Sequence, residues 1–243
     1  MTRDDSKTPA PAPGKSPTAQ SSSTDISSFL SQVKAMGPAG NGASGRLIFA
    51  LDATLSRQPT WDMACHLQAD MFKEAASVGK LAMRLIYYRG FNECRATGWI
   101  TDTAKLAALM GRIDCVGGNT QIGKVLADAR REASASGVRA LVFVGDAMEE
   151  EIDDLCARAG ELGLLKVPCF MFQEGHDAAA ERAFREIARL TGGAWCRFDP
   201  GSAAQLRELL RAAAAYAAGG HEALRRLSSA SREATRLLGQ MRS

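Results

Sequence analysis

Short apolar runs alternate along the chain with longer segments in which apolar residues recur at helical spacing. A run of roughly four to eight apolar residues is typical of a buried strand, and a three-four periodicity over a longer stretch is typical of an amphipathic helix. Strands are therefore predicted at 46–52, 81–88, 93–99, 138–145, 165–172 and 194–198. Helices are predicted at 60–79, 102–110, 120–136, 149–163, 177–190 and 202–218.

The order of these elements predicts the fold class. Nearly continuous apolar strands separated by helices are typical of a parallel sheet that is buried on both faces. We therefore predict an α/β fold, a doubly wound three-layer sandwich with a mostly parallel central sheet. The segment 93–99 follows a turn at 90–92 and is predicted to be one antiparallel edge strand. Ligand sites in such sheets lie outside the carboxyl ends of the strands.

Composition divides the chain into four parts. Residues 1–24 hold four of the eight prolines and no Val, Ile, Leu or aromatic residue, which predicts a disordered tail. Residues 25–45 are expected to form a short amphipathic helix and a Gly-rich linker, and 46–218 the sandwich domain. Residues 219–243 are predicted to be a basic C-terminal helix, which either packs on the sheet or docks on a partner or acidic surface. Its apolar stripe, which Ser231 interrupts, comprises Leu224, Leu227, Ala234, Leu238 and Met241.

The charge and the cysteines limit the classes of partner and the location. The formal net charge is +3, and the positive excess lies in the last helix, so nucleic acid is not an expected partner. Neither a long apolar run nor a signal-peptide pattern occurs in the sequence, so no membrane span is expected. The six cysteines are scattered and form no metal-binding or disulfide pattern. A cytoplasmic location follows as the simplest expectation.

Three segments at predicted strand ends carry polar residues suited to a metal ion. The first holds Asp52, Thr54 and Ser56, the second is a Gly-Gly-Asn-Thr loop ending at Thr120, and the third ends at Asp146. Each segment alone is typical of a helix cap or of a polar strand end. Together they offer two carboxylates and three hydroxyls, which are hard oxygen ligands that suit Mg²⁺ or Mn²⁺.

These residues resemble the von Willebrand factor A (VWA) family and its metal-ion-dependent adhesion site. That site follows an Asp-x-Ser-x-Ser pattern with a distant Thr and a distant Asp, and here Thr54 replaces the first Ser. The resemblance covers about 46–218. It implies that Thr54 and Ser56 bind the metal directly, and that Asp52, Thr120 and Asp146 bind it directly or through water. It also implies a binding module, not an enzyme, whose partner protein completes the metal with an exposed Asp or Glu.

Polar and charged residues that follow the motif segments are interpreted without a role as metal ligands. Arg57 and Gln58 follow Ser56 and are predicted to lie on the rim, where they would contact a partner. The acidic run Glu149, Glu150 and Glu151, with Asp153 and Asp154, is predicted to complement a helix N-terminus.

Two alternatives to the metal-dependent module remain open. Gly118 to Lys124 fits the spacing of a nucleotide-binding P-loop with Asp146 as its acidic partner, but Val125 stands where Ser or Thr would hold Mg²⁺. A second alternative is a metal-free VWA-like scaffold. A phosphatase that uses Asp52 as nucleophile is not favoured, because position 54 lacks the second carboxylate of that motif.

Overall fold

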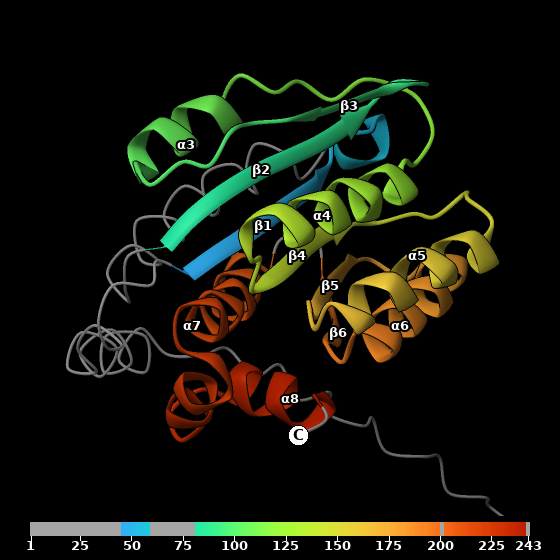
Figure 1. Ribbon diagram of the computed structural model, residues 1–243. Coiled ribbons are helices and arrows are strands. Elements are labelled where there is room, and N and C mark those ends of the chain that lie inside the picture. The colour runs from blue at the N-terminus through green and yellow to red at the C-terminus, as the bar shows by residue number, and fades with distance from the viewer. Residues whose placement is uncertain (1–44, 59–80, 200–201, 242–243) are drawn as a thin grey trace, which may run out of the picture.

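A six-stranded sheet lies at the centre of the computed structural model, which describes residues 45–58, 81–199 and 202–241 (Figure 1). The strands are β1 (Gly45–Asp52), β2 (Leu81–Arg89), β3 (Glu93–Ala96), β4 (Ala140–Gly145), β5 (Cys169–Glu174) and β6 (Ala194–Phe198). Their order across the sheet is β3-β2-β1-β4-β5-β6. Every neighbouring pair is parallel except β2 and β3, so the predicted antiparallel edge strand is confirmed.

Two helical layers cover the two faces of the sheet. One face packs against α3 (Thr103–Met110), α7 (Ala203–Ser228) and α8 (Arg232–Gln240). The other packs against α4 (Ile122–Ser136), α5 (Ile152–Leu164) and α6 (Ala178–Thr191). Alternate residues of β1 enter opposite layers, as Phe49 and Ile48 do, and both are buried. The predicted three-layer sandwich is confirmed.

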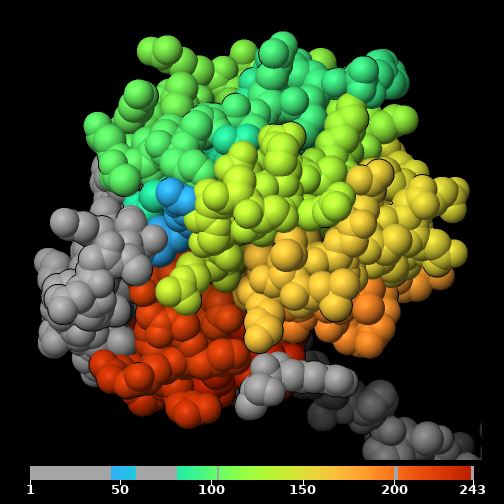
Figure 2. All heavy atoms as spheres, viewed as in Figure 1, coloured from blue at the N-terminus to red at the C-terminus, as the bar shows by residue number. Residues whose placement is uncertain are grey.

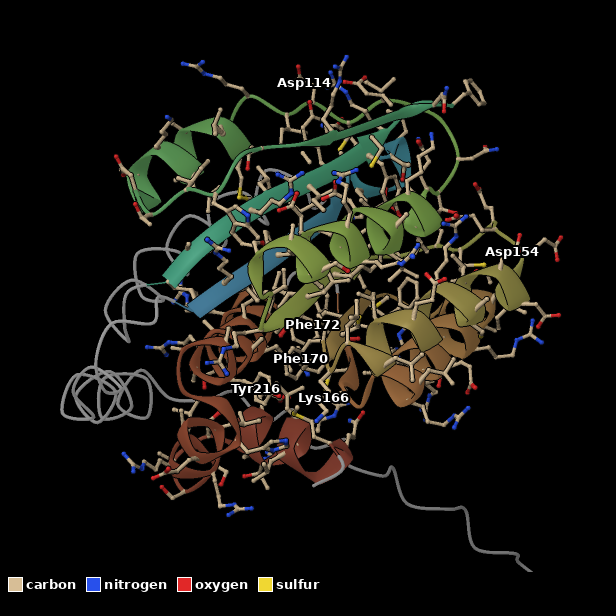
Figure 3. The ribbon with its side chains drawn as sticks, in the orientation of Figure 1. Asp114, Asp154, Lys166, Phe170, Phe172 and Tyr216 are labelled. Atoms are coloured by element: carbon tan, nitrogen blue, oxygen red, sulfur yellow. The ribbon has the colours of Figure 1, made fainter. Side chains whose placement is uncertain are left out.

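Aromatic side chains join the sheet to the first of these layers. Phe170 and Phe172 on β5 lie in the buried cluster that α7 covers, and Tyr216 of α7 packs against that cluster (Figure 3). The rings of Phe170 and Tyr216 meet edge to face, with 5.5 Å between their centroids.

The predicted tail, the amphipathic helix and linker before Gly45, and the predicted helix at 60–79 lie outside the described residues.

The C-terminal region is organised differently from the single separate helix that the sequence suggested. The range of α7 includes a break at Gly220, whose φ of 66° and ψ of −158° are not helical, so the chain does change direction at the predicted Gly-Gly pair. The helical piece after this break ends at Ser228, and α8 follows as a further helix. Leu224, Leu227 and Leu237 are buried, so this region packs on the sheet layer. Figure 2 shows it in red, in close contact with the body of the molecule.

The packed stripe of α8 also differs from the expected one by one position. The sequence placed Leu238 on the buried face, whereas Leu237 is fully buried and Leu238 is half-buried. The hydroxyl of Ser231 accepts a hydrogen bond from the Ala234 amide and starts a new helix there. A new helix has its own phase, so the periodicity that runs from α7 does not extend into α8.

The edge strand β6 is closed by a side chain. The amide of Trp195 donates to Oε1 of Gln240, and Nε2 of Gln240 donates to the carbonyl of Trp195, each over 2.8 Å. The Gln240 side chain therefore pairs with β6 as a neighbouring strand would.

Among the described helices, none has both the length and the apolar composition that crossing a bilayer requires.

Candidate metal centre

The parallel pairing of β1 and β4 brings the two predicted carboxylates to one edge of the sheet. Leu51 lies opposite Val144, so Asp52 ends β1 beside Gly145, and Asp146 follows directly. Asp52 is fully buried, and its Oδ1 accepts the Thr54 amide over 2.8 Å. Within the described residues, Asp52 Oδ2 and Asp146 Oδ1 are buried and have no hydrogen-bond partner. Such oxygens are costly unless a cation or donor meets them.

Two of the predicted hydroxyls lie side by side in the turn after β1. This turn, η1 (Leu55–Arg57), holds Thr54 Oγ1 and Ser56 Oγ 3.0 Å apart. Thr54 is buried next to Asp52, while Ser56 is exposed. The hydroxyl pair thus leads from the buried carboxylate to the surface.

Thr120 is tied to the loop that carries Asp146. The Thr120 amide donates to Glu149 Oε2 over 3.1 Å, and the Glu149 amide donates to Thr120 Oγ1 over 3.0 Å. The loop before Thr120 also presses on the β2–β3 turn, because a Cβ on Gly118 would lie 2.0 Å from the Gly90 carbonyl. Only glycine permits that approach. The structure therefore brings the second and third predicted segments together.

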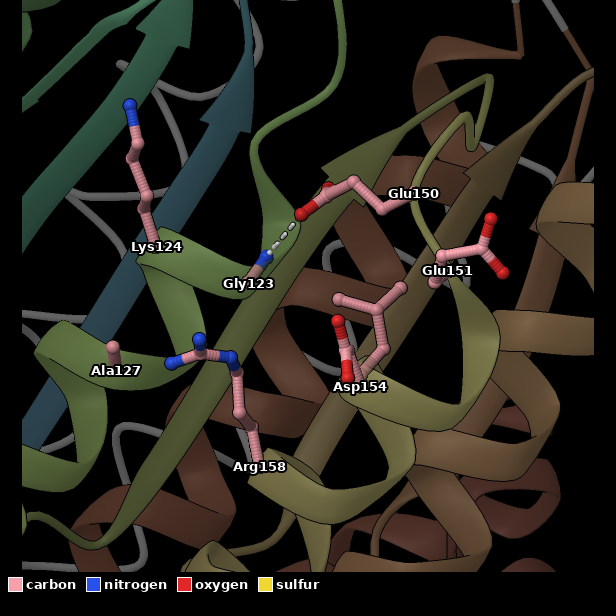
Figure 4. A pocket seen from close by; sticks show the side chains of 8 residues that line it. Gly123, Lys124, Ala127, Glu150, Glu151, Asp154 and Arg158 are labelled. Atoms are coloured by element: carbon pink, nitrogen blue, oxygen red, sulfur yellow. Dashed lines mark hydrogen bonds between the residues drawn. The ribbon is translucent and has the colours of Figure 1, made fainter.

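The acidic run divides between two helices. Asp153 and Asp154 lie in the first turn of α5, as predicted. Glu150 instead caps α4, where its carboxylate accepts the amides of Ile122 and Gly123, the latter over 2.9 Å (Figure 4). A pocket of about 320 Å³ lies between these helices, and none of the five predicted site residues lines it.

The prediction that Arg57 lies on the rim is wrong. Its side chain is fully buried and forms an ion pair with Glu174, the last residue of β5. Gln58 is exposed, as expected. Arginine in a loop is usually solvated, and the sequence pattern carries no sign that a partner strand supplies a buried acid. Glu174 was not recognised, although an acid that ends an apolar run was the signal that identified Asp52.

Burial and neighbouring charges set the electrostatics of this edge. Burial raises the pKa of Asp52 to about 6, against the hydrogen bonds from Thr54 and the Arg57 charge, which lower it, while Asp146 raises it. Burial lowers the pKa of Arg57, whereas Asp146 and Asp52 raise it. Tyr88, opposite Asp52 on β2, is held neutral by burial and by that carboxylate, both of which raise its pKa. The Arg57 charge therefore offsets only part of the cost of a charged Asp52, whose pKa stays raised.

The donor set fits a hard divalent cation only if the hydroxyls take part. Among the described residues, no group of three or more His, Cys, Asp or Glu side chains is placed to hold a metal ion. The unpartnered oxygens of Asp52 and Asp146 and the hydroxyls of Thr54 and Ser56 nevertheless match the oxygen ligands of Mg²⁺. The hydroxyl of Thr120 keeps a second lone pair after it accepts the Glu149 amide.

The nucleotide-binding alternative gains no support from this geometry. A P-loop follows a strand, whereas the residues from Gly111 to Gly118 form a loop without a strand. Lys124 does not face an open phosphate cradle, because its Nζ contacts the side chains of Asn92 and Gln121, the latter over 2.8 Å.

Comparison with known proteins identifies the fold. A von Willebrand factor type A protein from Catenulispora acidiphila superposes with a TM-score of 0.59 at 19% identity, over 72% of this chain and 44% of that one. The fold is that of a VWA domain. The VWA domain of SpRpn10 matches with a TM-score of 0.50 at 13% identity, over 65% of this chain and 89% of its own. Human COPII-coat protein Sec24c matches with a TM-score of 0.51 at 11% identity, over 71% of this chain and 32% of its own.

Sequence comparisons add no closer relationship. No protein-family profile matches the chain, and no curated protein matches it in sequence. The identities to the solved VWA domains are low enough that they establish the fold alone.

Proposed function

We propose that this VWA domain is a divalent-metal-dependent protein-interaction module. The observation that carries the proposal is the pair of buried, unpartnered carboxylate oxygens of Asp52 and Asp146 beside the hydroxyl pair of Thr54 and Ser56. Mg²⁺ or Mn²⁺ is the ion that this donor set suits. Thr120 would complete the set, through its hydroxyl directly or through water.

The residues of such a site would have different roles. Asp52 and Asp146 supply negative charge from the rigid ends of two paired strands. Ser56 is exposed and marks the side from which a partner approaches. A bound divalent ion would supply a concentrated positive charge that attracts a carboxylate of the partner. The partner is therefore expected to present an exposed Asp or Glu.

Exposed apolar side chains beside the motif add a second requirement for the partner. Leu55, Phe91 and Val116 are all exposed. Leu55 lies against Gly117, and the Gly90 amide donates to the Val116 carbonyl over 3.3 Å, which joins Val116 to the turn that carries Phe91. Apolar side chains gathered around a polar centre are typical of protein-interaction sites. We expect apolar residues next to the acidic side chain of the partner.

The proposal includes a binding role without catalysis and a cytoplasmic location. The open position of the metal site is used by the partner's carboxylate, which leaves no position for a substrate. The five cysteines among the described residues are all unpaired, as in a reducing compartment.

Replacing Asp52 with Ala tests the proposal. Calorimetry with Mg²⁺ and Mn²⁺ should show binding to the wild type and no binding to Asp52→Ala, with circular dichroism unchanged. Asp153→Ala is the matched control, because Asp153 is exposed in the first turn of α5, and it should bind like the wild type.

Affinity capture of partners extends this test. The wild type should capture a partner with Mg²⁺ and lose it with chelator, while Asp52→Ala should fail in both conditions. Unchanged metal binding by Asp52→Ala would show that the site is misplaced. A wild type that binds neither ion and keeps its partner in chelator would favour the metal-free scaffold.

A further inference from the structure

One buried guanidinium at the candidate metal centre forms an ion pair with the carboxylate of Glu174 and interacts electrostatically with those of Asp146 and Asp52. Gly145 on β4 lies opposite Gln173 on β5, so Asp146, which follows β4, comes beside Glu174, the last residue of β5. Asp52 ends β1 on the other side of β4. The Arg57 side chain is 0% exposed, and that of its ion-pair partner Glu174 is 6% exposed.

The position of Arg57 couples it to the metal-binding turn. Arg57 is the residue after Ser56 and lies in the same short helix, so its backbone cannot shift independently of the hydroxyl pair. Its guanidinium interacts electrostatically with Asp146 first and Asp52 second. A buried charge interacts strongly with its neighbours because little water screens it.

We infer that Arg57, anchored by Glu174, is a fixed counter-charge that keeps Asp52 and Asp146 stable without metal and sets how tightly they hold a divalent cation. This inference rests on the proposed function, since it concerns the same site. It makes Arg57 a positioning residue that tunes affinity, and it gives Glu174 a role that opposes that of Arg57.

Removing the charge of Arg57 and removing that of Glu174 should have opposite effects on metal affinity. Loss of the Arg57 charge removes the counter-charge that the described residues place beside the three carboxylates, so the folded protein should come to depend on metal and bind it more tightly. Loss of the Glu174 charge leaves Arg57 with Asp52 and Asp146 as its main partners, so metal binding should weaken. If Arg57 and Glu174 only supported the fold, the two changes would not shift the metal affinity in opposite directions.

The experiment compares Arg57→Gln, Glu174→Gln and Arg57→Lys by calorimetry with Mg²⁺ and Mn²⁺, without any partner protein. We expect the metal Kd to fall at least about tenfold in Arg57→Gln and to rise at least about tenfold in Glu174→Gln, since unscreened unit charges act at short range. Arg57→Lys keeps the charge and should stay within about threefold of the wild type. Thermal unfolding of Arg57→Gln should show a low Tm in chelator that excess Mg²⁺ restores.

Arg211→Gln is the matched control. Arg211 is also buried and forms an ion pair with a glutamate, Glu208, over 2.8 Å, but both residues lie on α7. This variant should lower Tm equally in chelator and in Mg²⁺, and should leave the metal Kd unchanged.

The possible outcomes distinguish failure of the inference about Arg57 from failure of the proposed function. Equal metal affinities in the wild type and Arg57→Gln would overturn the inference and leave the proposed function standing. Metal binding by Arg57→Gln alone would support the inference and overturn metal-dependent binding by the native chain. Absence of binding by both proteins would overturn both ideas. If Arg57→Gln does not fold in chelator, folding on addition of Mg²⁺ supports the inference, and failure to fold with Mg²⁺ overturns it.

Discussion

Thr120 has a structural task that does not require a metal. Its hydroxyl accepts the Glu149 amide, and its own amide donates to the Glu149 carboxylate. The two residues are 29 positions apart in the sequence, so this reciprocal pair fixes two loops against each other. The same hydroxyl is a candidate metal ligand, which means that its removal should have an effect even in chelator.

We therefore predict that Thr120→Val lowers the free energy of unfolding by about 1 kcal/mol in chelator, because the Glu149 amide loses its acceptor. Thr120→Ser keeps the hydroxyl and should stay close to the wild type. Urea titration followed by circular dichroism measures both. Equal stability of the Val variant and the wild type in chelator would limit Thr120 to a role in metal binding.

At the residue scale, the sequence predicts the candidate site residues that lie at strand ends. It does not predict those that are brought together only by strand pairing across the sheet. Asp52 and Asp146 were found because an acid after an apolar run marks the edge where ligands bind. Arg57 and Glu174 are brought together by the register of strands that are far apart in the sequence. A local pattern cannot show that an arginine has a buried partner.

Helix α4 receives its N-terminal cap from another loop. Gln121 precedes the helix and forms no side-chain cap, and Glu150 supplies the carboxylate instead. The negative charge also meets the positive end of the helix dipole. The N-terminus of α4 is therefore held by the loop that follows β4.

We predict that Glu150→Ala lowers the free energy of unfolding by about 2 kcal/mol, because two helix amides lose a charged acceptor. Glu151→Ala removes the same charge from the neighbouring position, where the side chain is exposed and caps nothing, and should change stability by less than about 0.5 kcal/mol. Differential scanning calorimetry compares the two. Similar losses in both variants would contradict a specific cap and indicate a general effect of charge.

The bounds of a helix or strand follow from the sequence where its hydrophobic periodicity is uninterrupted. They follow less well where a helix cap starts a new helix with a different phase. The ends of β6 were placed correctly because glycines and prolines bound that strand. The apolar stripe after Gly219 predicts one helix, with Ser231 as a single interruption. The Ser231 cap starts α8 in a new phase, and only tertiary contacts show which leucine becomes buried.

The whole molecule closes one edge of its sheet with its C-terminal helix. Gln240 satisfies the amide and the carbonyl of Trp195, which lies 45 residues earlier in the chain. An open edge strand presents unpaired backbone groups that recruit another chain. α8 therefore protects the molecule from association as well as covering its core.

We predict that Gln240→Ala lowers the free energy of unfolding by about 1–2 kcal/mol and promotes concentration-dependent association, because the Trp195 backbone loses both partners. Arg236→Ala on the same helix removes an ion pair with Glu233 (3.8 Å) but leaves the Gln240 contact in place, so it should stay monomeric like the wild type. Sedimentation velocity and thermal unfolding measure the two effects. A Gln240→Ala variant that stays monomeric at full stability would contradict this role.

The Gln240 contact also has a consequence for the order in which the protein is made. During synthesis from the N-terminus, β6 emerges before the side chain that completes its edge, and the two are separated by the whole of α7. The nascent domain therefore exposes an incomplete sheet edge until residue 240 has emerged from the ribosome, and an unpaired strand edge is prone to aggregation during that interval.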